Sequence, residues 1–249
     1  MFWVATSLRA LSIALLIVFA LSFGCTPGRA GDADNGIARA SIDFELGKRS
    51  LYRSIKRDFP DDYESIANAF HGAALKSNDA DVIADVVANV MIDIRRRRSD
   101  LVRRASSITL RTLSKGMAEF HRDLQRTEGN AFCAAYARDG ASAFEAAGKP
   151  NTHRETIDGQ LALLWELFKE GQEKPTERST PTNSDWIAVA TEMLNRGAQE
   201  ASFDVVFEER YDDPEYCSAF VIFLDALAAT RGDPGDRVRA YFLAEYARS

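Results

Sequence analysis

The sequence predicts an all-α fold, a bundle-like or orthogonal multi-helix globular domain of about nine helices. Apolar residues recur at spacings of three and four through most of the chain after residue 37, which is the period of an amphipathic helix. Capping residues, glycines and prolines separate these stretches. A hydrophobic content of 46% with 27% charged residues is typical of a folded protein. No segment shows a convincing strand alternation.

Three helices are expected before the arginine run. The first spans residues 37–56 and ends before Pro60, because the residue preceding a proline is pushed out of the α region. The second and third span residues 61–76 and 79–94, and aspartates in the opening turns of the third suit the positive end of a helix. Their apolar positions keep helical spacing: Ile42, Leu46, Leu51, Ile55, Tyr63, Ile66, Phe70, Val82, Ile83, Val86, Val87, Val90, Met91 and Ile94.

A basic helix follows the arginine run. Its apolar residues keep a 3-4-3-4 rhythm, which suits an antiparallel or coiled-coil-like partner. They are Leu110, Leu113, Met117, Phe120 and Leu124. Ser99 and Asp100 could cap a new helix, so we expect a break or kink there.

The remaining helices lie in an acidic C-terminal half. We expect one over residues 130–147, capped by Asn130 and ended by Gly148. Thr152 and Glu155 fit a capping box for the next, which continues to a polar loop at residues 172–183.

Three further segments complete the chain. Ser184 is expected to cap a helix that carries Trp186, Ile187, Ala190 and Leu194 on its apolar side. Residues 203–207 fit either a helix or a short strand. Asp213 starts a helix whose apolar run 221–227 should be central, and a last helix ends near Arg248.

Charge suggests how the chain is organised. Residues 95–126 hold 10 basic and 3 acidic side chains, whereas residues 127–249 hold 12 basic and 22 acidic ones. We therefore expect an N-terminal helical half with a basic helix, residues 37–127, and a C-terminal acidic half, residues 128–249, together in one compact domain. The net charge of -6 disfavours binding of nucleic acid.

The first 25 residues predict export. Fourteen uncharged, mostly apolar residues, Ala10 to Phe23, follow a start with the single charge Arg9. The run is shorter than the roughly 20 residues of a membrane span. Leu21-Ser22-Phe23-Gly24-Cys25 resembles the lipobox of bacterial lipoproteins, although Phe23 is bulkier and Leu21 lies one step earlier than that pattern prefers.

This resemblance implies a signal peptide at residues 1–24, lipid attachment at Cys25 and a tether at residues 25–36. It also implies a periplasmic protein of the bacterial cell envelope, anchored in the outer membrane because Thr26 follows the cysteine. Ordinary cleavage after Ser22 or Ala30, with a secreted product, and an uncleaved inner-membrane anchor are the alternatives.

Cys133 and Cys217 are the two cysteines of the chain besides Cys25. Both lie in the pattern aromatic-Cys-small-Ala-aromatic near the expected start of a helix. In an oxidising compartment two such cysteines favour a disulfide. Two buried free cysteines are the alternative.

No catalytic or cofactor motif is present, and no metal site or cofactor is predicted. His71, His121 and His153 are far apart, and His121 within Glu119-Phe120-His121-Arg122-Asp123 reads as part of a solvated helix face. A denser acidic cluster contains Asp204, Glu208, Glu209 and Asp212. Paired carboxylates can hydrolyse glycans, but an acidic surface is the simpler interpretation.

Arginines form the sharpest polar feature. Arg95, Arg96, Arg97 and Arg98 are consecutive, and Arg103 and Arg104 follow. Four consecutive side chains point all around a helix, so some must face solvent or a partner. Internal pairing with the acidic half and docking of an acidic partner or anionic lipid are the two interpretations, because Arg binds carboxylate and phosphate bidentately.

These features favour a non-enzymatic, lipid-anchored helical interaction protein of the cell envelope, such as an inhibitor, an immunity-type partner or an assembly factor. A hydrolase that uses clustered carboxylates and a small-ligand carrier are the alternatives, so enzymatic activity stays open. A protein partner, a membrane anchor and no nucleic acid are expected.

Overall fold

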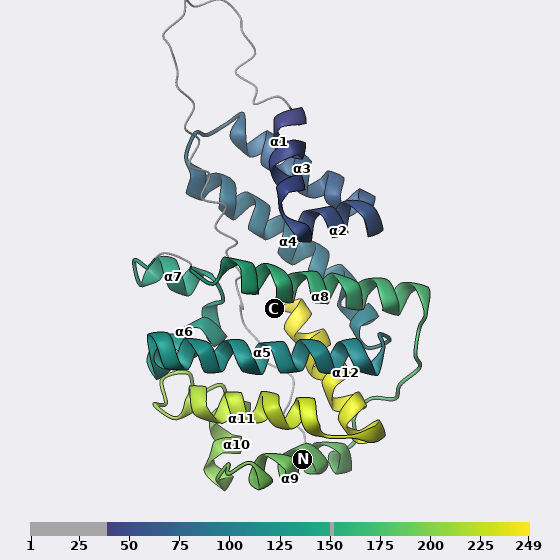
Figure 1. The fold of residues 1–249 in the computed structure, drawn as a ribbon, viewed down its shortest axis with the longest axis vertical. Coiled ribbons are helices and arrows are strands. Elements are labelled where there is room, and N and C mark those ends of the chain that lie inside the picture. Colours follow the sequence, from purple (N-terminus) through teal and green to yellow (C-terminus); the bar gives the residue numbers. More distant parts are fainter. Residues whose placement is uncertain (1–38, 150–151) are drawn as a thin grey trace, which may run out of the picture. The chain divides into compact units, whose positions relative to one another are not determined.

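The computed structural model describes residues 39–149 and 152–249, and these residues form twelve helices and no strand (Figure 1). The predicted all-α class is confirmed, but the count of about nine helices is too low. The helix expected first divides at Arg49, and the one expected at residues 130–147 divides at Gly140. The ambiguous segment 203–207 is helical.

The predicted signal peptide, the tether and the lipid attachment at Cys25 lie outside the described residues. Among the helices that are described, none combines the length and the apolar character needed to cross a membrane.

The described residues fall into two compact units, residues 39–93 and residues 94–149 with 152–249. The helices that begin in the first are α1 (Arg39–Lys48), α2 (Ser50–Asp58), α3 (Pro60–Ala74) and α4 (Ala80–Val102). Those of the second are α5 (Ser107–Glu128), α6 (Asn130–Asp139), α7 (Ser142–Ala146), α8 (Arg154–Glu173), α9 (Asn183–Asn195), α10 (Glu200–Phe207), α11 (Tyr216–Ala229) and α12 (Gly232–Arg248).

In the first unit, α1, α2 and α3 pack on one another around a small core that includes Leu46, Ile55 and Ile66. The carbonyls at the break between α1 and α2 find local partners. Arg53 Nη1 donates hydrogen bonds to Gly47 O at 2.9 Å and to Lys48 O at 2.8 Å, which satisfies carbonyls at the end of α1.

The second unit begins at Ile94, inside α4. Residues 127 and 128, where the two expected halves meet, both lie in this unit, at the end of α5. Because α5 packs on α6, α8, α11 and α12, the basic helix shares a core with the acidic C-terminal half. The break expected at Ser99 is absent, because α4 continues to Val102, and the Ser99 hydroxyl donates to Arg96 O at 2.9 Å within the helix. The chain breaks after Val102, and Ser106 caps α5.

The core of the second unit centres on α5 and α11, which lie side by side with α8 on the other side of α5 and α9 beyond α11 (Figure 1). As expected, the apolar run of α11 is central: Phe223, Leu224 and Leu227 are almost fully buried.

A disulfide joins two of these helices. Cys133, in the first turns of α6, is bonded to Cys217, at the start of α11, with a Cα–Cα distance of 5.7 Å. Both cysteines are buried. This is the pair that the matching sequence contexts predicted.

One glycine marks a close helix contact. A Cβ atom on Gly171 of α8 would lie 2.0 Å from Leu101 O, at the end of α4. Gly171→Ala should therefore lower the free energy of unfolding by about 2 kcal/mol, because backbone must move. Gly159→Ala in the same helix meets nothing within 4 Å. It should stabilise by about 0.5–1 kcal/mol through helix propensity. Denaturant unfolding of both variants tests the pair, and equal effects would contradict the contact.

The start of α9 is fixed by charged and capping contacts. Thr182 and Asp185 form a capping box, two residues before the cap expected at Ser184. Asp185 is buried, and Arg237 of α12 holds its two oxygens at 2.6 and 2.9 Å. The hydrogen bonds from Arg237 outweigh burial and keep the pKa of Asp185 well below its usual value. The carboxylate therefore stays charged at neutral pH and ties α9 to α12.

Candidate functional sites

The consecutive arginines are not equivalent. Arg95 is buried, and its Nη2 donates to Tyr246 O at 2.8 Å while its guanidinium lies 5.6 Å from the ring centre of that tyrosine. Arg96 Nε donates to Arg248 O at 3.1 Å. Both acceptors are carbonyls at the end of α12, where a helix lacks internal partners and favours positive charge.

Of the other arginines, one pairs with α12. Arg103 pairs with Glu245 of α12 at 2.8 Å, whereas Arg104 is exposed and lies 3.8 Å from Glu177. Arg97 is exposed, and Arg98 is half-buried. The docking role expected of Arg95 is corrected, because a partner cannot reach a side chain that is 1% exposed. Arg96, Arg97 and Arg104 are the exposed members of the predicted set.

The acidic cluster lies at the end of α10 and on the turn before α11. Glu208 pairs with Arg210, and Asp212 lies 3.9 Å from Arg138. Glu209 has a φ of 53°, and hydrogen bonds from residues 209 and 210 back to α10 form a helix-ending turn that usually contains glycine. Burial raises the pKa of the Glu209 carboxyl. None of these carboxylates lines the groove that lies between α5 and α8.

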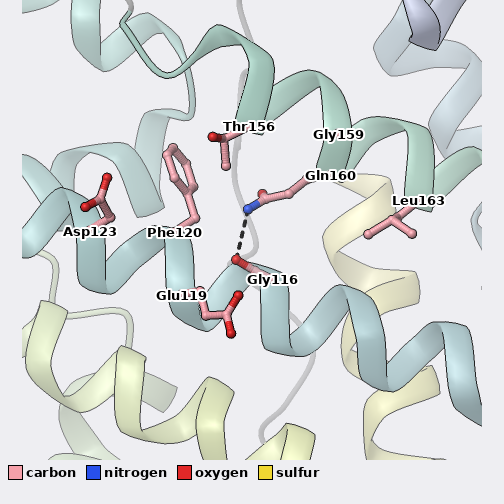
Figure 2. Close-up of a pocket in the computed structure, with 8 residues that line it drawn as sticks. All are labelled: Gly116, Glu119, Phe120, Asp123, Thr156, Gly159, Gln160 and Leu163. Atoms are coloured by element: carbon pink, nitrogen blue, oxygen red, sulfur yellow. Dashed lines mark hydrogen bonds between the residues drawn. The ribbon is translucent and has the colours of Figure 1, made fainter.

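That groove has a volume of about 380 Å³ and is open to solvent. Its lining comes from two helices: Gly116, Glu119, Phe120 and Asp123 of α5, and Thr156, Gly159, Gln160 and Leu163 of α8 (Figure 2). The Gln160 amide reaches across it and donates to Gly116 O at 3.2 Å.

Of the motif around His121, only Glu119, Phe120 and Asp123 line the groove. His121 is buried on the other side of α5, where burial lowers its pKa to about 4, so the expectation of a solvated face is wrong. Asp123 forms an ion pair with Arg126, and His153 Nδ1 lies 3.7 Å from its carboxylate. Among the described residues, no group of three or more His, Cys, Asp or Glu is placed to hold a metal. The groove can offer hydrogen bonds and negative charge to a ligand.

A surface that the sequence did not reveal lies on α9 and α10. Ile187 and Leu194 of α9 are 64% and 47% exposed, and Phe207 of α10 is 51% exposed. Ile187 and Leu194 are seven residues apart, so they lie on one side of α9. Trp186 connects the two helices, since its ring lies 5.7 Å from that of Phe207. We call Ile187, Leu194 and Phe207 the α9–α10 face.

The side of α9 that was expected to be apolar, with Ile187 and Leu194, is not the buried side. The buried positions of α9 are Asp185, Val189 and Met193. Ile187 and Leu194 point in a different direction from these, so the helix has more apolar surface than one buried stripe needs. Large apolar side chains that stay exposed together on one side of a helix are typical of interaction sites.

Comparisons with protein-family models, with curated proteins and with solved structures find no match for this chain.

Proposed function

We propose that this protein is an exported, lipid-anchored interaction protein of the bacterial cell envelope that binds another protein through the α9–α10 face. The exposure of Ile187, Leu194 and Phe207 is the observation that carries the proposal. Large apolar and aromatic side chains are the usual anchors of protein interfaces, where their burial against a partner drives association.

The surroundings of the face support a binding role. The ion pair of buried Asp185 with half-buried Arg237 fixes the first turn of α9, and Trp186 packs between Phe207 and Tyr241. A rigid surface loses little conformational entropy on binding. The Cys133–Cys217 disulfide is compatible with an oxidising compartment.

Replacement of Ile187 by Asp tests the function. The variant should keep its unfolding free energy within about 0.5 kcal/mol, because the side chain is exposed. It should lose the protein that co-purifies with the wild-type chain from envelope fractions. Ile108→Asp on α5 is the matched control, since Ile108 is 79% exposed and lies outside the face. Identical co-purification by both variants and the wild type would refute the proposal.

The membrane anchor has its own test. Cys25→Ser should release the protein from membranes or leave an unprocessed precursor, because the thiol is the proposed attachment point. Intact mass spectrometry of the mature wild-type protein measures the modification directly. A mass equal to that of the unmodified chain would exclude lipidation and favour ordinary signal cleavage.

A further inference from the structure

We infer that the α9–α10 face binds a cationic amphipathic helix of its partner protein. The inference rests on the proposed function and adds the chemistry of the partner. It follows from the carboxylates beside the face, from the pairing of the nearby arginines, and from the spacing of the apolar side chains.

Two carboxylates share the outward side of α10 with Phe207. Glu200 and Asp204 are separated by four residues, and Phe207 follows at seven residues from Glu200, so the three lie on one side of the helix. Both carboxylates are exposed. Neither makes an ion pair within the part of the chain that the structure describes.

The nearby basic side chains are already engaged. Arg196 pairs with Glu192 at 2.9 Å, and Arg210 pairs with Glu208. Asp204 raises the pKa of Arg210 only through the longer-range charge effect, after the larger effect of Glu208. On α10, the Phe207 end of the apolar face is therefore accompanied by negative charge that the described residues leave without an ion pair.

This negative charge determines which kind of partner the α9–α10 face can bind. A second copy bound through the same face would place Glu200 and Asp204 near their own counterparts, and like charges repel. An anionic membrane surface would be repelled for the same reason. Lys or Arg beside apolar side chains complements both parts of the surface.

The dimensions fit one helix. Ile187 and Leu194 lie about 10 Å apart along α9, which is about two helical turns. An amphipathic helix presents apolar side chains at the same interval, with flanking cations on its polar side. Those cations would reach Glu200 and Asp204 while the apolar stripe covers Ile187, Leu194 and Phe207.

The test uses synthetic helices and the full chain. The probe is a labelled amphipathic peptide of about 14 residues, composed of Leu and Lys. Its controls are a scrambled peptide of the same composition and a Leu/Glu peptide with the same apolar stripe. Fluorescence anisotropy should show binding of the amphipathic Leu/Lys peptide only, with affinity that falls as salt is added. Equal binding of either control peptide would overturn the inference.

Matched variants locate the interaction. Glu200→Gln combined with Asp204→Asn should weaken binding of the Leu/Lys peptide about tenfold and reduce its salt dependence. Glu173→Gln combined with Glu177→Gln removes two exposed carboxylates that lie outside both the face and the groove, and should leave the affinity unchanged. Equal affinities of the two double variants would overturn the inference.

Failure of the inference differs from failure of the proposed function. If Ile187→Asp abolishes co-purification of the partner but Glu200→Gln with Asp204→Asn does not, the face binds a protein without the charge complementarity. If Ile187→Asp has no effect on co-purification, the proposed function itself fails.

Discussion

Reduction of the Cys133–Cys217 disulfide should lower the free energy of unfolding by about 4 kcal/mol. The bond joins residues 84 positions apart, so in the unfolded chain it closes a long loop and removes conformational entropy. In the folded protein it links α6 to α11, and α11 packs on α5 in the core. The unfolding midpoint in denaturant, measured with and without reductant, reports the difference.

The comparison of oxidised and reduced wild type isolates the cross-link, because both sulfur atoms stay in place. A Cys133→Ala and Cys217→Ala double variant is the control. Its stability should not respond to reductant, although both buried positions lose volume. The same midpoint for oxidised and reduced wild type would show that the bond adds nothing to stability.

Helix positions were largely predictable, because burial of one apolar side imposes a period that the sequence records. The assumption of a single buried side failed for α5. That helix packs on α8 and on α11, so the adjacent residues Phe120 and His121 are both buried. Sequence spacing cannot show how many neighbours a helix will have.

Helix ends were less predictable, since tertiary contacts compete with local capping. The capping box expected at Thr152 does not form. His153 precedes α8 without a side-chain cap, and its ring contacts Phe120 and Phe144 instead. The α9–α10 face was missed for a related reason: helical spacing identifies Ile187 and Leu194 as apolar, but only the packed structure shows that no helix among the described residues covers them.

Arg239 is the buried charge whose loss should cost most. It is fully buried on α12, and its Nη1 donates to Leu227 O and, at 2.9 Å, to Thr230 O at the end of α11. Its Nη2 donates to Asp236. Burial alone would raise the pKa of Asp236, but hydrogen bonds from Ser107 and Arg239 outweigh it and lower that pKa. The arginine therefore satisfies one carboxylate and two carbonyls at once.

Arg239→Met should lower the free energy of unfolding by about 3–5 kcal/mol, because it leaves these acceptors without their donor. Arg239→Lys should recover only part of the loss, since one ammonium cannot reproduce the planar array of donors. Arg97→Met is the matched control, and as a change at an exposed arginine it should stay within about 0.5 kcal/mol.

A double-mutant cycle separates the ion pair from the carbonyl contacts. If the Arg239–Asp236 pair contributes most, Arg239→Met combined with Asp236→Asn should cost clearly less than the sum of the two single changes. If capping of α11 dominates, the costs should add, because Leu227 O and Thr230 O lose their donor in either background. A loss below about 1 kcal/mol for Arg239→Met would mean that water satisfies the acceptors that lose Arg239. The buried arginine would then not hold α12 against α11.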